Sequence, residues 1–347
     1  MQPIHPLTTL LKQSGCQYLV FDLGRRIQPI EAKQFQKIEQ GQQPYPYPLQ
    51  RQAHLAIVYW NEHQQPWIWF TKFPLDERGL LIQAEINQFI QYVIEAMGSR
   101  LQQTLTEEQQ QKLANNPYTF QPTEEKMAVL HSQIRAQLHL PTSQYYEHAQ
   151  HYFSGGLGWE NWQTVGLQGI SDIGARLRQQ NNSVFIRKAL DHLPSSPLYA
   201  LLGVLEHVNI PDNIASKLYE MANQQMSSSQ TDLFLLSALV RALSGATPNY
   251  LAKLTDAILA TPDYCHQEVL IGLAGRAWST LRESGRAQRF LLRLVQTENQ
   301  TLFNRLFADL VMLPELRMVL LPLLHTSPSP ELAKALLQLQ RSTKQSS

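Results

Sequence analysis

A repeated pair of apolar segments in the second half of the chain constrains the fold more than any other feature. Four short apolar stretches align with one another, namely LLGVL (201–205), LLSAL (235–239), LIGLA (270–274) and LFADL (306–310). Their second residues are 34, 35 and 36 positions apart, and each stretch is followed by a helix breaker and a second amphipathic segment. This period predicts stacked helical hairpins, so we expect an all-α solenoid of about four to five helix pairs over residues 159–342.

The repeat differs from the tetratricopeptide class, although the period is close. The W-x2-L-G-x2-Y and A-x3-F pattern of that class is missing. The variable repeat length and the small residues near the start of each pair resemble HEAT-type helical repeats instead; these residues are Gly203, Ser237, Gly272 and Ala308. Proteins with HEAT-like arrays mostly bind other proteins, so the resemblance implies a binding role.

The first hundred residues mix strand and helix periodicities, which is typical of a small α+β domain. Segments rich in β-branched and aromatic residues predict strands at 17–23, 26–30, 54–60 and 66–73. The last two flank the turn sequence NEHQQ and predict a hairpin. Apolar residues at helical spacing predict helices at 7–13, 31–40 and 80–97. We therefore expect a small antiparallel sheet backed by helices over residues 1–100.

The length of the chain also predicts more than one domain. At 347 residues it exceeds the size at which a single hydrophobic core usually stops growing. Residues 101–158 are expected to form a helical connector, which includes a capped helix from Thr106 and ends at the linker SGGLG (154–158). Residues 343–347 are expected to form a disordered tail.

Composition excludes several classes of partner. The chain has 29 basic and 28 acidic side chains, a formal net charge of +1, so only a local patch could attract nucleic acid. No apolar stretch approaches the roughly 18 to 20 residues of a membrane-spanning helix, and the N-terminus lacks the pattern of a signal peptide. Two cysteines, Cys16 and Cys265, fit a reducing compartment. We expect a cytoplasmic protein with no membrane partner.

Motifs for catalysis and metal binding are sparse. The sequence contains no G-x-S-x-G, H-E-x-x-H, C-x-x-C or Walker motif, so we expect a non-enzymatic protein without a cofactor. The tightest group of potential zinc ligands is in YYEHAQHYF, where His148 and His151 would share one face of a helix. No third ligand is close in sequence, so a surface helix is the preferred interpretation. An enzyme with a site between the domains ranks third among the candidate functions.

A run of arginines supports the second candidate function, association with nucleic acid. Arg282, Arg286, Arg289 and Arg293 follow one another at steps of 4, 3 and 4 residues, which on one helix would form a basic stripe. Gly285 predicts a turn that separates Arg282 from the other three. Solvated arginines on an outer helix are the simpler interpretation, so nucleic acid is considered but not favoured as a partner.

The aromatic residues of the first domain form a third group of candidates. Prolines alternate with tyrosines in PYPYP (44–48), directly before a predicted strand, and alternation places two tryptophans on one face of the hairpin. Tryptophan and tyrosine are enriched at protein interfaces, although a core or inter-domain contact is the favoured interpretation. The candidate binding residues here are Tyr45, Tyr47, Arg51, His54, Trp67 and Trp69. The prolines lack P-x-x-P spacing and favour a stiff, extended connector into the strand.

Five long strings also resemble one family across nearly the whole chain. They are VFDLGRR (20–26), QPYPYPLQRQAHLA (43–56), PWIWFTKFPLDERGLL (66–81), LTEEQQQKLANNPYTF (105–120) and TSQYYEHAQHYFSGG (142–156). The chain resembles the uncharacterised bacterial domain-of-unknown-function family 3549. That resemblance implies one shared architecture and brings no activity, cofactor or partner with it. Our leading hypothesis is a non-enzymatic protein-binding or scaffold protein, whose unidentified protein partner contacts the concave face of the solenoid or the aromatic sheet.

Overall fold

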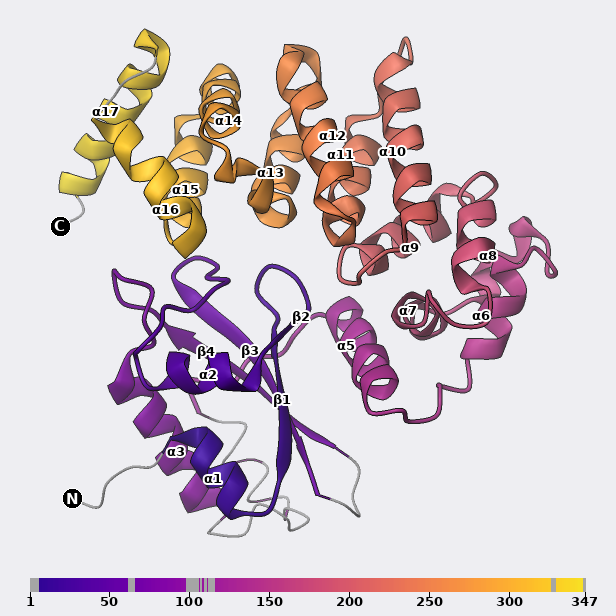
Figure 1. The fold of residues 1–347 in the computed structure, drawn as a ribbon, viewed down its shortest axis with the longest axis vertical. Coiled ribbons are helices and arrows are strands. Elements are labelled where there is room, and N and C mark those ends of the chain that lie inside the picture. The colour runs from indigo at the N-terminus through magenta and orange to yellow at the C-terminus, as the bar shows by residue number, and fades with distance from the viewer. Residues whose placement is uncertain are drawn as a thin grey trace. The chain divides into compact units, whose positions relative to one another are not determined.

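The computed structural model consists of two compact units (Figure 1). It describes residues 6–61, 66–97, 116–325 and 329–345, together with Thr106, Glu108 and Gln111. Unit 1 comprises Met1–Pro122 with Met312–Pro314, and unit 2 comprises Thr123–Val311 with Glu315–Ser347. The first holds an antiparallel sheet with helices, and the second is helical. The predicted fold class, an α+β domain followed by an all-α region, is confirmed. The helix expected from Thr106 lies largely outside the described residues.

Unit 1 is built on a four-stranded sheet of order β2-β1-β3-β4, in which every pairing is antiparallel. The strands are β1 (Gln17–Asp22), β2 (Gln28–Ile30), β3 (Gln52–Trp60) and β4 (Trp67–Pro74). Strands β3 and β4 form the predicted hairpin, whose register places Tyr59 opposite Trp67 and Gln52 opposite Pro74. Strand β2 is short and contains Pro29, as expected of an edge strand, because proline cannot donate a ladder hydrogen bond.

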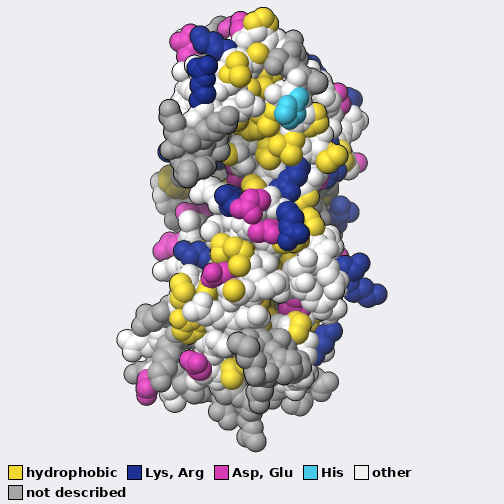
Figure 2. All heavy atoms as spheres, turned by 90° about the vertical axis from the view of Figure 1, so that its left-hand side faces the viewer, with side chains coloured by type: hydrophobic (Ala, Val, Ile, Leu, Met, Phe, Trp, Pro, Cys, Tyr) yellow, Lys and Arg dark blue, Asp and Glu magenta, His cyan; other side chains and the backbone are white. Residues whose placement is uncertain are grey.

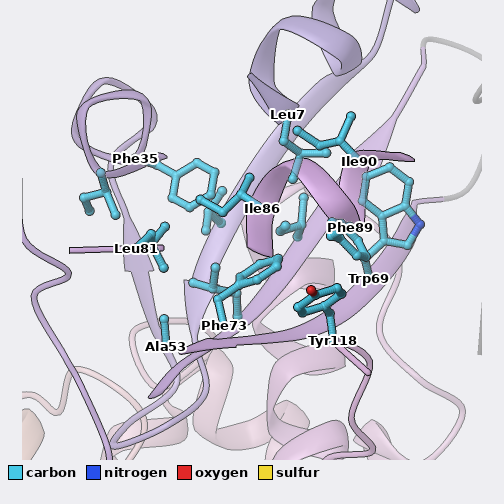
Figure 3. Packing of buried hydrophobic residues seen from close by; sticks show 14 of the residues in the cluster. Leu7, Phe35, Ala53, Trp69, Phe73, Leu81, Ile86, Phe89, Ile90 and Tyr118 are labelled. Atoms are coloured by element: carbon cyan, nitrogen blue, oxygen red, sulfur yellow. The ribbon is translucent and has the colours of Figure 1, made fainter. Parts of the chain in front are cut away.

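Three helices pack against one face of this sheet and close the core of unit 1 (Figure 3). They are α1 (Leu7–Gln13), α2 (Ala32–Glu39) and α3 (Gln83–Met97). Alternate residues of β3 face them, because side chains along a strand point to opposite faces; these residues are Ala53, Leu55, Ile57 and Tyr59. The helices contribute Leu7, Phe35 and Phe89 to the same cluster.

Unit 2 is a succession of helices in two rows, which follow an arc in Figure 1. The first row lies on the inner side of the arc and contains α5 (Glu124–Gln137), α7 (Leu167–Ala175), α9 (Ser195–Leu205), α11 (Leu233–Ala242), α13 (Gln267–Arg276) and α15 (Gln300–Val311). The second row contains α6 (Tyr146–Phe153), α8 (Asn182–Ala189), α10 (Asp212–Ser227), α12 (Pro248–Ala260), α14 (Ser284–Gln296) and α17 (Pro330–Gln345). Within each row, every helix packs on the next one of that row. Helix α16 (Pro314–Leu320) lies between α15 and α17 in the chain.

Small residues permit close approach at one contact of the first row. The Ser237 hydroxyl of α11 donates to the Glu268 carbonyl oxygen of α13 at 2.9 Å. A Cβ atom on Gly272 would lie 2.9 Å from that hydroxyl oxygen, so a larger residue there would have to displace the Ser237 hydroxyl. Ile271 departs from the sequence alignment: it is exposed, whereas the residues aligned with it in the other repeats are buried. Its neighbour Leu270 is buried.

Candidate functional site

Tyr45 of the PYPYP segment is a core residue rather than a surface one. Its side chain is fully buried, and its hydroxyl donates a hydrogen bond of 2.6 Å to Asp22 Oδ1 at the end of β1. Burial, followed by the charge of Asp22, raises the pKa of the Tyr45 phenol well above its usual value. The same carboxylate accepts the backbone N–H groups of Gly24 and Arg25, so it organises the turn after β1. Tyr47 packs edge-on against the Tyr45 ring.

The polar candidates of unit 1 do not converge on one site. Arg51 is exposed and its guanidinium lies 3.3 Å from the Glu77 carboxylate, a surface ion pair of the kind that contributes little to stability. His54 lies on the opposite face of β3 from the helices, with its ring edge-on to Phe120 at 5.2 Å between centroids.

Both tryptophans of the hairpin face the helices. Trp69 is buried, and its ring lies 4.4 Å from Tyr59 and 6.1 Å from Phe89, measured between centroids. Trp67 is half-buried and stacks on Tyr59 at 5.6 Å. The alternation predicted from the sequence is therefore present, and the face that carries the tryptophans is the core face.

The arginines of α14 bind groups of the neighbouring helix α12. Arg286 forms a bidentate pair with Asp256, with N···O distances of 3.0 and 2.8 Å, and Arg289 reaches the same carboxylate at 2.8 Å. Arg293 donates to the carbonyl oxygens of Leu259 and Ala260 at the end of α12. The helix begins at Ser284, so Arg282 lies outside it and pairs with Glu315. The stripe thus joins two helices of the second row.

The histidine pair of α6 shows no metal-binding geometry. His148 Nε2 lies 3.0 Å from the Thr164 hydroxyl oxygen, and the His151 ring packs over Gly156. Within the described part of the chain, no group of three or more histidine, cysteine, aspartate or glutamate side chains is placed to hold a metal ion.

A charged cluster that sequence reasoning missed joins three consecutive helices of the first row. Glu206 follows α9, Arg241 lies in the last turn of α11, and Arg276 ends α13. Glu206 Oε1 accepts hydrogen bonds from Arg276 Nε and Nη2 at 3.2 and 3.1 Å, while Arg241 Nε lies 3.6 Å from Oε2. His207 Nε2 is 3.2 Å from Oε1. Glu206, Arg241 and Arg276 follow one another at steps of 35 residues. This step equals the repeat period, so a comparison of equivalent positions across the repeats could have found the cluster.

Apolar side chains accompany this cluster on the surface of the same helices. Tyr199 on α9, Phe234 on α11 and Ile271 on α13 are exposed at 38%, 61% and 40%. Asp232 and Arg241 of α11 lie close enough to Tyr199 to influence its phenol; burial and the Asp232 charge raise its pKa, and Arg241 opposes them. Gly203 lies between Tyr199 and Glu206 on α9, and no described atom lies within 4 Å of where its Cβ would be.

A second apolar patch lies at the C-terminal end of unit 2. Met318, Leu321 and Leu337 are exposed there, Met318 at 80%. Figure 2 views the molecule from the side that carries α17 and shows hydrophobic side chains gathered near the top of that face.

Comparison with known proteins identifies a family for the whole chain. A family model described as "Protein of unknown function (DUF3549)" matches residues 2–340. The chain belongs to this family. No curated protein and no solved structure matches it significantly. Membership in this family therefore confirms the resemblance read from the sequence and assigns no activity. Among the described helices, none is both long and apolar enough to cross a membrane.

Proposed function

We propose that unit 2 is a HEAT-like solenoid whose first row binds another protein, and that the chain is a non-enzymatic scaffold. One observation carries the proposal: exposed apolar side chains recur on three successive helices of the first row, α9, α11 and α13. Stacked helix pairs expose much surface per residue, and proteins of this architecture use it to bind partners. Large apolar side chains clustered on a surface are typical of protein–protein contacts.

Two features favour this surface over the other candidates. Tyr45 and Trp69 belong to the core of unit 1, so the sheet presents little of their area to a partner. The arginines of α14 already bind Asp256 and backbone carbonyls, so a nucleic acid would have to displace those contacts. Both cysteines are buried and form no disulfide with each other, which supports a cytoplasmic location as part of the proposal.

Site-specific photo-crosslinking in the native cell tests the proposed function. A photoreactive phenylalanine analogue is placed at Phe234 on the first row and, as the matched control, at Gln224, an exposed position on α10 of the second row. We expect a reproducible protein adduct from position 234 and none from position 224. The proposal is wrong if position 234 gives no adduct, or if positions 234 and 224 give the same adducts in equal yield.

A further inference from the structure

The surface of α9 and α11 has an apolar end and a cationic end. We call this the α9–α11 surface; it consists of Tyr199, Gly203, Glu206, Phe234 and Arg241. Tyr199 and Glu206 are seven residues apart, as are Phe234 and Arg241, so each pair lies on one face of its helix across two turns. At 1.5 Å per residue, the two ends are separated by about 10 Å.

The cationic end has an arginine with unused donors. The Glu206 side chain is only 10% exposed, and its Oε1 is engaged by Arg276. Arg241 Nε is 3.6 Å from Oε2, beyond the usual hydrogen-bond distance, and the Arg241 guanidinium forms no hydrogen bond within the described part of the chain. The side chain of Arg241 remains 42% exposed. Arg276 already donates to Oε1 of this carboxylate, so Arg241 keeps donors for a further acidic group. A guanidinium binds a carboxylate through two parallel hydrogen bonds.

Gly203 is exposed between the two ends. It lies in the last turn of α9, where helical backbone makes glycine less favourable than alanine. Packing does not explain it, because no described atom lies within 4 Å of a Cβ built there. Its φ also lies outside the left-handed region that only glycine adopts easily, so the backbone does not require glycine either. Glycine at such a position allows the backbone of a ligand to approach closely.

We propose that the α9–α11 surface binds a protein segment in the polyproline II conformation that carries an acidic side chain three residues from a large apolar one. The inference rests on the proposed function and names the partner's chemistry. Polyproline II has 3 residues per turn and rises 3.1 Å per residue, so side chains three residues apart lie on one face of the segment and about 9 Å apart, close to the separation of the two ends. The carboxylate pairs with Arg241, the apolar side chain packs on Tyr199 and Phe234, and the backbone between them passes over Gly203.

A protein segment fits this surface better than a nucleic acid does. Asp232 caps α11 at the apolar end, where its Oδ1 accepts the backbone N–H groups of Phe234 and Leu235. A chain of phosphates laid over the surface would meet this acidic group as well as Arg241. A peptide brings one negative charge to the arginine and an apolar side chain to the aromatic end.

A displayed library of random dodecapeptides, selected against the full chain, tests the proposal. We expect the enriched peptides to carry Asp or Glu three residues from Phe, Trp or Leu. Synthetic copies of these peptides should bind Arg241→Gln and Gly203→Ala at least tenfold more weakly than they bind the original chain. Arg305→Gln is the control, since it removes an exposed arginine on α15, and it should bind the peptides as tightly as the original chain does. Gly203→Ala should also raise the thermal midpoint, so weaker binding cannot result from a damaged fold.

The outcomes separate this proposal from the proposed function. Peptides without the acidic residue, affinities unchanged by Arg241→Gln or Gly203→Ala, or a library that yields no binder would each overturn the proposal. Binding of a fluorescein-labelled single-stranded DNA that requires Arg241 would overturn it in favour of nucleic acid. Adducts from position 234 that persist in any of these cases would leave protein binding standing with a partner of different chemistry.

Discussion

Replacing Tyr45 by Phe tests whether the PYPYP segment is held to the sheet through Asp22. The substitution keeps the buried ring and removes only the hydroxyl, which donates a hydrogen bond of 2.6 Å to the fully buried Asp22 carboxylate. A hydrogen bond to a charged group contributes about 1.5–3 kcal/mol. Asp22 keeps the N–H groups of Gly24 and Arg25, so it is not left without donors. We expect the free energy of unfolding of unit 1 to fall by about 2 kcal/mol.

The two cysteines allow this loss to be assigned to one unit. Cys16 is buried in unit 1 and Cys265 in unit 2, and burial raises the pKa of the Cys265 thiol to about 11. A thiol reagent at pH 8 therefore reacts with each cysteine only when its surroundings open, and the rate follows the open population when reclosing is fast. A loss of about 2 kcal/mol corresponds to a roughly 30-fold faster reaction of Cys16 in Tyr45→Phe. The rate at Cys265 should not change.

Tyr92→Phe is the matched control for this experiment. Tyr92 lies on α3 against the same core, and its hydroxyl makes no hydrogen bond with the residues that the structure describes. A steep urea dependence of labelling identifies cooperative opening rather than fraying around Cys16. If Cys16 reacts no faster in Tyr45→Phe than in Tyr92→Phe, or if Cys265 accelerates equally, the hydrogen bond to Asp22 does not hold the segment.

Three further predictions concern charge and packing. Burial raises the pKa of the Glu39 carboxyl above 4.5 in the folded state. As pH rises, the unfolded state therefore loses this proton first, and the free energy of unfolding falls until the pH passes the folded pKa. Urea titrations at several pH values should show this fall in the original chain and not in Glu39→Gln. Hydrogen bonds from Arg286, with help from Arg289, lower the pKa of Asp256 below 3.8. The stability that Asp256 contributes is therefore present above pH 3.8 and lost as the pH falls through the folded pKa. Acid unfolding followed by circular dichroism should show a smaller loss of stability with falling pH in Asp256→Asn than in the original chain. Gly272→Leu should lower the thermal midpoint more than Gly275→Leu, since only at Gly272 does a Cβ meet Ser237, at 2.9 Å.

Periodicity in the sequence was sufficient to predict the fold class but not the rotation of each helix. The alternation of β3 and β4 placed Trp67 and Trp69 together, yet it could not say which face of the sheet the helices cover. The repeat period predicted paired helices, but it did not predict that α13 would expose Ile271 and bury Leu270. A one-residue error of register is invisible in a pattern of adjacent apolar residues, because either residue satisfies the pattern.

For the polar residues of the candidate sites, too, the sequence did not show which partner each side chain would contact. Tyr45 is of a residue type that is common at interfaces, so the sequence suggested a surface role. Its hydrogen-bond partner Asp22 lies 23 residues earlier in the chain, at the end of a strand that only folding brings near it. The arginines of α14 were recognised as a stripe, but their partners on α12 lie 30 or more residues earlier. Sequence patterns show which residues share a helix face, and they do not show which neighbouring element that face meets.

The cluster around Glu206 is visible only when the sequence is read across repeats instead of along them. Glu206, Arg241 and Arg276 look unrelated in the chain, but a step of 35 residues brings them to the same end of three stacked helices. A buried ion pair is weak evidence for stability, since apolar residues of similar volume often pack as well or better. Here the buried carboxylate also keeps two guanidinium groups beside an exposed aromatic surface. Under the proposed function, this cluster would therefore serve recognition rather than stability.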